Sequence, residues 1–376
     1  MVFNHSESIP RNLSLGIYRV LNLAMPIIPA GYNRDMKDAL IRQIADFISS
    51  TPVQTNEEMF ETLALQLFAR QYALVAPYRR LCDASGATPG AVRRWQDIPA
   101  VPAVAFKAFD LSAAPLTDSR AVFHSSGTTG AEASRHYFDA DGLTLYETSL
   151  RAGFRAALPN CPPRLWALMP NTEAAPNSSL SHMLGALGAE RFYWDNDAVL
   201  SGALNAVTEP VALFGTAFAF VQLFDGISGH WRVPEGSIVI ETGGFKGRSR
   251  EVPREELYGL FETRLGVPLT NCHSEYGMSE MASQFYGRGL NSEKRGPHWV
   301  RTRTIDPLTG EDSVPGAPGL LRHYDLANWN SVQALQTQDL GTLTPSGFLL
   351  HGRAPNAEVR GCSLTVEELW TSRSAS

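Results

Sequence analysis

Residues 238–247 read Ile-Val-Ile-Glu-Thr-Gly-Gly-Phe-Lys-Gly. A short apolar run that stops at two glycines is typical of a buried strand followed by a turn. We expect short buried strands at residues 237–241 and, from runs of the same kind, at residues 164–169 and 211–214. Helix-length stretches separate these expected strands from one another. Strands that alternate with helices predict an α/β fold with largely parallel sheets.

The regions on either side of these strands have different patterns. Residues 33–83 carry apolar side chains at helical spacing, whereas Pro99 and Pro102 prevent a regular helix at the start of residues 98–111. Residues 293–352 are rich in turns and β-forming side chains, which predicts a small barrel or an antiparallel appendage. We therefore expect a helical N-terminal region (1–97) packed on the body, an α/β core (98–352) with the appendage near 293–352, and a short C-terminal piece (353–376).

Composition limits the class of protein. A chain of 376 residues with 44% hydrophobic and 19% charged residues fits one large globular domain and a smaller piece. The net charge of −6, without a run of five basic residues, argues against nucleic acid as a partner. Arg19, Pro26 and Pro29 interrupt the apolar N-terminal stretch, so we expect neither a signal peptide nor a membrane span. Four dispersed cysteines without a C-x-x-C pair favour neither zinc nor a disulfide framework, which predicts a reduced, cytoplasmic protein.

A loop rich in hydroxyl groups and glycines interrupts the chain at residues 124–138, which read His-Ser-Ser-Gly-Thr-Thr-Gly-Ala-Glu-Ala-Ser-Arg-His-Tyr-Phe. Hydroxyls can donate to an anion, and glycines let the backbone approach it closely. The loop lacks the Walker A pattern. It fits either a phosphate-binding loop or a solvated surface turn. The candidate residues are Ser125, Ser126, Gly127, Thr128, Thr129 and Gly130.

Two later segments carry side chains suited to a nucleotide. Bare backbone at Gly243 and Gly244 could lie against a flat ring or a phosphate, although this segment alone favours a plain strand-to-helix turn. In the run from Tyr276 to Glu280 (Tyr-Gly-Met-Ser-Glu), the aromatic ring can stack on a purine and the serine can contact phosphate. The glutamate can hold Mg²⁺, which prefers one or two carboxylates together with substrate phosphates. A packed aromatic and a solvated carboxylate are the ordinary readings of Tyr276 and Glu280.

A third segment, residues 338–353, begins Gln-Asp-Leu-Gly and ends Gly-Arg. A carboxylate at a strand end, here Asp339, can accept hydrogen bonds from both hydroxyls of a ribose. Arg353 can then contact the sugar or the phosphate. A hairpin with a surface aspartate is the alternative interpretation of this segment alone.

The order of these four segments resembles the adenylate-forming superfamily, which includes acyl-CoA synthetases, luciferases and peptide-synthetase adenylation domains. Within it the chain is most similar to the LuxE-type acyl-protein synthetases. The resemblance extends to Phe106-Lys107 and to the Gly-Pro-His-Trp-Val run that starts at Gly296. It implies stacked βαβ subdomains with a small β-barrel, a helical N-terminal region and a truncated C-terminal domain.

The resemblance also implies roles for individual residues. The loop from Ser125 to Gly130 would grip the phosphates of ATP, and Gly243 and Gly244 would border the adenine. Tyr276 and Gly277 would cover the ring, while Ser279 would touch phosphate. Three further roles follow: Glu280 would hold Mg²⁺, Asp339 would bind the ribose, and Arg353 would lie at the hinge.

The chain departs from the superfamily in two places. Its phosphate loop lacks the usual Pro-Lys ending, and Lys107, Arg135 or Lys246 could supply the missing charge. The superfamily also places a lysine in a C-terminal domain, but the last lysine of this sequence is Lys294.

The segment around Cys362 offers a different route to a thioester. In the resembling family a cysteine near the C-terminus receives the acyl group, and Arg-Gly-Cys-Ser-Leu around Cys362 matches that place. In an extended segment Arg360 and Cys362 share a face, and a guanidinium lowers the pKa of a nearby thiol. A small buried cysteine is the alternative.

The expected function is ATP-dependent activation of a carboxylic acid, a fatty acid by the resemblance, to an acyl-adenylate. Transfer to Cys362 and delivery to an acyl-accepting protein such as a fatty-acid reductase would follow. Residues 210–224 could line the acyl pocket or pack the core. A phenylacetate-type acyl-CoA ligase that uses free CoA, and a non-catalytic nucleotide-binding scaffold, are the alternatives.

Overall fold

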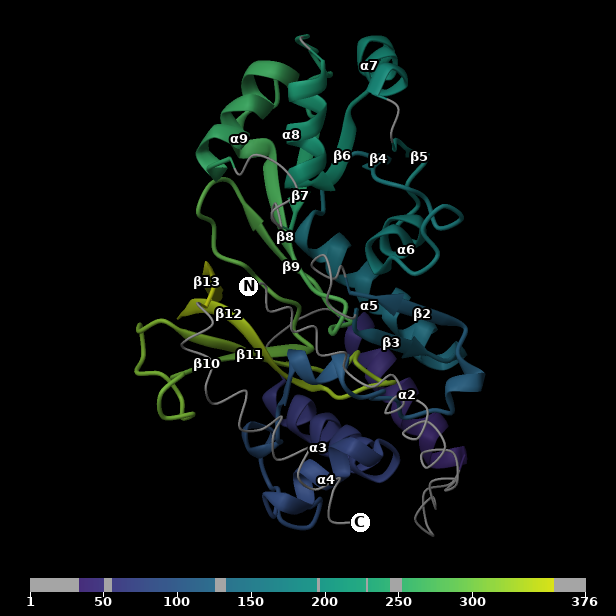
Figure 1. Cartoon of the computed structure of the whole chain (residues 1–376), viewed down its shortest axis with the longest axis vertical. Coiled ribbons are helices and arrows are strands. Elements are labelled where there is room, and N and C mark those ends of the chain that lie inside the picture. Colours follow the sequence, from purple (N-terminus) through teal and green to yellow (C-terminus); the bar gives the residue numbers. More distant parts are fainter. Residues whose placement is uncertain are drawn as a thin grey trace, which may run out of the picture.

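The computed structural model describes residues 34–50, 56–125, 133–194, 197–227, 229–243 and 252–354. Two sheets organise these residues, with β4 to β9 in the upper half of Figure 1 and β10 to β13 in the lower half. Helices cover both faces of the upper sheet, and further helices lie below the lower one.

The upper sheet has the order β5-β4-β6-β7-β8-β9, in which only β9 is antiparallel. Its strands are β4 Arg164–Leu168, β5 Arg191–Phe192, β6 Val211–Thr216, β7 Ile238–Thr242, β8 Cys272–Tyr276 and β9 Phe285–Arg288. The strands predicted at 164–169, 211–214 and 237–241 are confirmed, and so is the α/β class with a largely parallel sheet.

Both faces of this sheet are buried, which explains why β4, β6 and β7 are largely apolar without alternation. Val239 packs in one hydrophobic cluster with Phe220 and Phe261, below the helices α7 Asp197–Ala206, α8 Ala217–Gly226 and α9 Arg254–Leu260. Its neighbour Ile240 points to the opposite face. There it joins a hydrophobic cluster that includes Leu150 of α5 Ala140–Ala157 and residues of α6 Ser179–Ala186. The result is a three-layer α/β/α arrangement.

The lower sheet has the order β1-β12-β11-β10, with β13 also paired to β12. Its strands are β1 Val101–Pro102, β10 Val300–Ile305, β11 Gly319–Asp325, β12 Ala334–Thr344 and β13 Gly347–Arg353. All neighbours are antiparallel except β1 and β12. The predicted antiparallel appendage therefore takes one strand from outside residues 293–352, and the 3-10 helix Ala103–Lys107 follows that strand.

The predicted N-terminal helices are α2 Arg34–Ser49, α3 Glu57–Leu74 and α4 Ala76–Ala84. Helix α3 is fastened to the lower sheet by buried polar groups. The Gln71 side chain donates to the carbonyl of Asn328 at 2.7 Å, and Arg70 stacks 3.6 Å from the ring centroid of Trp329. Buried side chains with full hydrogen bonding fix the register of such contacts.

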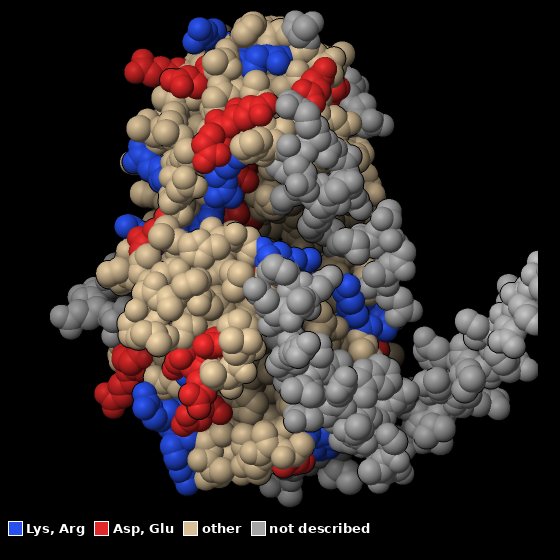
Figure 2. All heavy atoms as spheres, turned by 60° about the vertical axis from the view of Figure 1, so that its left-hand side comes forward, with Lys and Arg blue, Asp and Glu red and all other residues tan. Residues whose placement is uncertain are grey.

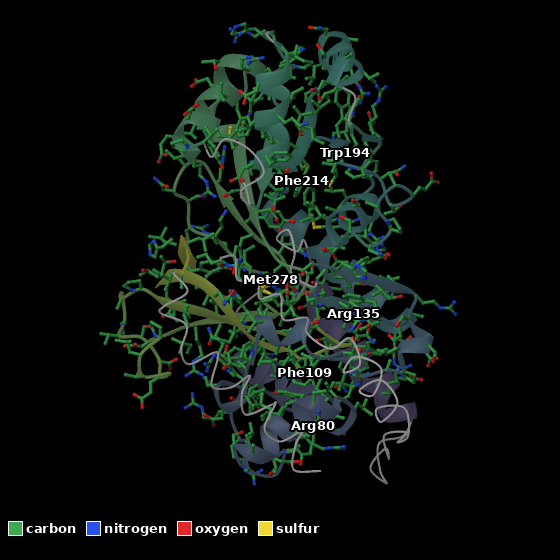
Figure 3. All side chains as sticks on the ribbon, in the orientation of Figure 1. Arg80, Phe109, Arg135, Trp194, Phe214 and Met278 are labelled. Atoms are coloured by element: carbon green, nitrogen blue, oxygen red, sulfur yellow. The ribbon has the colours of Figure 1, made fainter. Side chains whose placement is uncertain are left out.

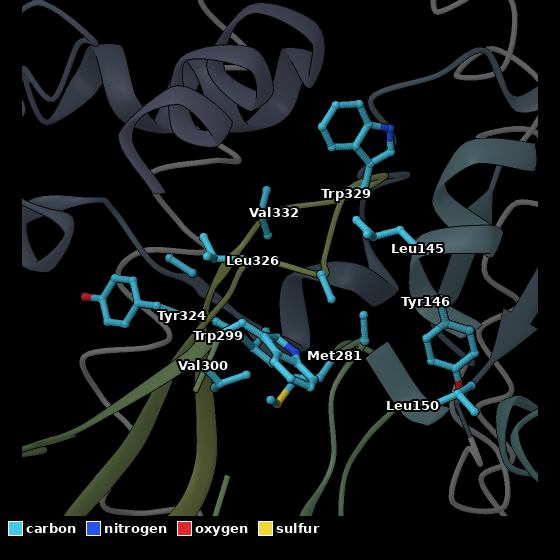
Figure 4. Packing of buried hydrophobic residues seen from close by; sticks show 14 of the residues in the cluster. Leu145, Tyr146, Leu150, Met281, Trp299, Val300, Tyr324, Leu326, Trp329 and Val332 are labelled. Carbon is cyan, nitrogen blue, oxygen red and sulfur yellow. The ribbon is translucent and has the colours of Figure 1, made fainter. Parts of the chain in front are cut away.

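One hydrophobic core joins the helices to both sheets. Figure 4 shows Trp299 beside Met281 and Val300, with Leu145 of α5 and Trp329 nearby. The indole of Trp299 donates to the hydroxyls of Ser149 and Ser283, at 3.1 and 2.9 Å. Since these groups come from α5, from the segment after β8 and from the start of β10, the core positions the two sheets relative to each other.

Candidate active site

A hairpin brings the ends of the hydroxyl loop together. It consists of β2 Ala121–His124 and β3 Arg135–Phe138. Just beyond the paired strands, the amide of Ser125 donates to the carbonyl of Ser134 at 3.1 Å, and the amide of Ser134 donates to Ser125 Oγ at 3.0 Å. The loop residues Ser126, Gly127, Thr128, Thr129 and Gly130 lie outside the described residues.

The base of this loop contacts the segment that follows β8. Ser134 Oγ donates to Glu280 Oε1 at 3.2 Å. The backbone carbonyl of Glu280 accepts from the Asn328 side chain at 2.8 Å. Figure 3 places Met278 of the same segment in the middle of the molecule, between Phe214 of the upper sheet and Phe109 of the lower part. Two segments that are about 150 residues apart in the sequence, as Ser134 and Glu280 are, thus meet at one site.

Tyr276 connects this site to the lower sheet. Its hydroxyl donates to Asp339 Oδ2 at 2.9 Å, while its ring packs against Phe285, Phe348 and His323. Burial raises the pKa of Asp339, and its hydrogen bond from Tyr276 and the charge of Arg353 act in the opposite direction. Arg353 lies directly opposite Asp339 in the pairing of β12 with β13. The structure therefore brings the candidate residues Tyr276, Asp339 and Arg353 together.

The two described glycines of the site are required for different physical reasons. Gly243, which directly follows β7, has φ +67, in the left-handed region, and no described atom lies within 4 Å of a Cβ built on it. At Gly277 a Cβ would lie 2.5 Å from Glu275 Oε1, so only glycine fits. Ser279 Oγ lies 3.2 Å from Ser179 Oγ at the start of α6. Gly244 and Lys246 lie outside the described residues.

A buried group of charged side chains behind Tyr276 was not predicted. Glu275 is fully buried, accepts a hydrogen bond from Thr242, and has a pKa raised to about 7 by that burial. Lys294 donates to Ser274 O at 3.2 Å, and burial lowers its pKa to about 8. Glu241 pairs with Arg254 at 3.3 Å, and burial raises its pKa. A carboxylate inside an apolar run is the sequence signal that could have found Glu241.

Three basic residues were proposed to supply the charge that the hydroxyl loop lacks, and the structure describes two of them. Arg135 forms an ion pair with Asp110 at 3.1 Å, and about half of its side chain is exposed. Lys107 is exposed at the end of its 3-10 helix. Neither arrangement singles out one residue as a phosphate contact.

Burial keeps the described thiols protonated. It raises the pKa of Cys82 to about 12, that of Cys161 to about 11 and that of Cys272 to about 12. Cys362 and Arg360 lie outside the described residues. A thiolate is the reactive form of cysteine, so none of the three described thiols is activated.

Glu280 fits a magnesium ion held mainly by a nucleotide. The part of the chain that the structure describes contains no group of three or more His, Cys, Asp or Glu side chains that could hold a metal. About 12% of the Glu280 side chain is exposed, beside the base of the hydroxyl loop. A single accessible carboxylate is what Mg²⁺ needs when phosphates supply its other ligands.

The surface around the site is mixed in charge. Figure 2 shows acidic and basic side chains interspersed, and a hollow between the part that carries α8 and α9 and the part that carries β10 to β13. A separate cavity of about 130 Å³ lies near the ends of β4 and β5, lined by Leu168, Trp194 and Ala219 among others. Among the helices that the structure describes, none combines the length and the apolar character that a membrane crossing requires.

Solved structures with the same architecture exist. No protein-family model and no curated protein matches the sequence. A structure of 2-hydroxyisobutyryl-CoA ligase in the postadenylation state, in complex with 2-HIB-AMP, superposes with a TM-score of 0.62 at 15% identity, over 82% of this chain and 70% of that chain. The chain has the fold of the adenylate-forming enzymes.

Two other states of that ligase share this adenylate-forming fold. An open conformation with 2-HIB-AMP and CoA gives a TM-score of 0.58 at 15% identity, over 79% of this chain and 75% of that chain. The thioesterification state gives 0.55 at 16% identity, over 87% and 70%. The α/β fold expected from the sequence is thereby confirmed.

Proposed function

We propose that this protein activates a carboxylic acid with ATP, forming an acyl-adenylate and pyrophosphate. The observation that carries the proposal is the meeting of two pairs at one site, Tyr276 with Asp339 and Ser134 with Glu280. The first pair suits an adenosine, and the second lies at the base of a loop suited to phosphates. The adenylate-forming fold of the chain supports the same reading.

In the proposed reaction, a carboxylate oxygen of the acid attacks the α-phosphorus of ATP, and the bond to the β-phosphate oxygen breaks. Tyr276 would stack on the adenine and Asp339 would accept hydrogen bonds from the ribose hydroxyls. Ser279 and the hydroxyl loop that begins at Ser125 would donate to phosphate oxygens, and they would stabilise charge that develops on pyrophosphate. Mg²⁺, when bound with the nucleotide, supplies further charge neutralisation, and Glu280 would hold it.

The finer proposal is that Cys362 then takes the acyl group. Its thiolate would attack the acyl carbonyl, and AMP would leave with the bonding electrons of the acyl–phosphate link. An acyl-accepting protein such as a fatty-acid reductase would receive the group. The protonated state of Cys82, Cys161 and Cys272 supports Cys362 as the acceptor, since it leaves no activated thiol among the described residues.

The resemblance to the acyl-protein synthetases favours a fatty acid as the carboxylic acid substrate. Residues 210–224, suggested as the acyl pocket, divide between two environments. Phe220 and Phe224 are buried in the core, whereas Ala219, Gln222 and Leu223 line the cavity of about 130 Å³. The core reading therefore holds for the two phenylalanines.

Intact-mass measurement tests the complete proposal. The protein is incubated with Mg-ATP and each of several fatty, short hydroxylated and aromatic acids. We expect an acyl-sized increment in the wild type and in Cys161→Ser, and its loss in Cys362→Ser with acid-dependent pyrophosphate exchange retained. Acyl-CoA without a protein adduct would support the CoA ligase instead. Silence in both assays would favour the scaffold.

A further inference from the structure

Three polar side chains form a line that ends at Glu280. His136 Nε2 lies 2.8 Å from Ser134 Oγ, and Ser134 Oγ lies 3.2 Å from Glu280 Oε1. His136 is 4% exposed and Ser134 is 1% exposed. The ring of Phe106 covers the imidazole, with 5.0 Å between the ring centroids. The line is thus closed to solvent at its histidine end and reaches the candidate site at its carboxylate end.

The protons that these three groups carry determine which group donates in each of the two hydrogen bonds. A serine hydroxyl has one proton to donate, and an ionised carboxylate can only accept. Ser134 must therefore give its proton to Glu280 and accept one from His136. This requires a proton on the Nε2 atom of the His136 ring.

The order of the three groups excludes a nucleophilic triad. In such a triad the histidine stands between the serine and the acid and removes the serine proton. Here the serine stands between the histidine and the acid, and its side chain is buried. The line can orient a carboxylate, but it cannot activate the hydroxyl for attack.

We propose that Ser134 and His136 are positioning residues that hold the Glu280 carboxylate in one orientation at the base of the hydroxyl loop. The backbone of Ser134 is paired with Ser125, and the backbone carbonyl of Glu280 is held by Asn328, so both ends of the contact are fixed. Groups that hydrogen-bond a metal-binding carboxylate raise its affinity by pre-orienting it. This proposal rests on the proposed function for the identity of the ligand that Glu280 meets.

Two measurements test it. The first is the nitrogen NMR spectrum of the His136 ring in the wild-type protein without ligands, which should show the proton on Nε2, and Ser134→Ala should shift that signal. The second is the affinity of Mn²⁺ for the protein with a non-hydrolysable ATP analogue, followed by water proton relaxation. His136→Leu and Ser134→Ala should weaken it by about tenfold. His136→Gln, whose amide nitrogen can replace Nε2, should stay near the wild type.

A matched control removes a different buried serine hydroxyl. Ser149→Ala breaks hydrogen bonds to Ser283 and Trp299 and should leave Mn²⁺ affinity unchanged. A His136 ring without a proton on Nε2, or wild-type Mn²⁺ affinity in folded His136→Leu, would overturn the positioning role. If the wild type binds no nucleotide at all, the proposed function fails. The NMR result still shows whether His136 donates from Nε2 to Ser134.

Discussion

Glu275 is a carboxyl group with almost no contact with water. It sits between Thr242, which donates to it, and Gly277, whose missing Cβ leaves room for it. Burial raises its pKa to about 7, against about 4.3 for an exposed glutamate. The folded chain therefore keeps a proton here that the unfolded chain releases between these values.

This proton makes stability depend on pH. Between about pH 4.3 and 7 the folded state binds one proton more than the unfolded state at this site, so the free energy of unfolding falls as pH rises. Glu275→Gln mimics the protonated form and removes the effect. From pH 5 to 8 we expect the stability of the wild type relative to Glu275→Gln to fall by about 2–3 kcal/mol.

Urea unfolding at several pH values measures this difference. Asp325, with a pKa raised to about 6 by burial, contributes equally in both proteins. Glu235→Gln, at an exposed position, is the matched control and should run parallel to the wild type. If the curves of the wild type and Glu275→Gln are parallel as well, Glu275 does not retain its proton.

The sequence reveals only some of the individual residues that form the candidate site. Tyr276, Asp339 and Glu280 could be selected as candidates from the sequence because a pattern of neighbouring residues accompanies each. Ser134, His136 and Lys294 have no such pattern, since their roles come from partners up to about 146 positions away, as Glu280 is from Ser134. Their contacts become visible only when the chain is folded.

At the scale of elements, the first turn of α5 packs directly on the turn between β11 and β12. A Cβ at Gly142 would lie 1.4 Å from Asn330 Oδ1, and Asn330 is 2% exposed, so it has little room to move. Gly142→Ala should destabilise the protein by about 1–3 kcal/mol, despite the better helix propensity of alanine.

A second helical glycine provides the comparison. Gly259 in α9 has no atom of the described residues within 4 Å of a Cβ built on it. Gly259→Ala should therefore stabilise by about 0.5–1 kcal/mol through helix propensity alone. Thermal unfolding of both variants checks the pair. Equal effects of the two substitutions would mean that α5 is not seated against Asn330.

Strands and helices could be predicted where a local sequence pattern specifies them. Short apolar runs predicted the strands β4, β6 and β7, because all three lie inside one sheet with both faces covered. The membership of β1 in the lower sheet could not be predicted. Its partner is Leu335, and a parallel pair of residues 101 and 335 leaves no mark in either local sequence.

At the scale of the whole molecule, one short segment joins the two sheets. Lys294 exchanges backbone hydrogen bonds with Phe348 of β13, and Arg295 exchanges them with Tyr286 of β9. The Lys294 side chain then reaches Ser274 of β8. The candidate site lies where the sheets meet, so Tyr276 from one sheet can contact Asp339 from the other.

Adenylation at this junction can be measured as acid-dependent exchange of labelled pyrophosphate into ATP. With Mg-ATP and a panel of carboxylic acids, we expect exchange that requires one class of acid. It should be lost in Asp339→Ala, reduced in Tyr276→Ala and retained in Cys362→Ser. A folded wild-type protein that shows no exchange with any acid, or the same exchange in Asp339→Ala, would contradict adenylation at this junction.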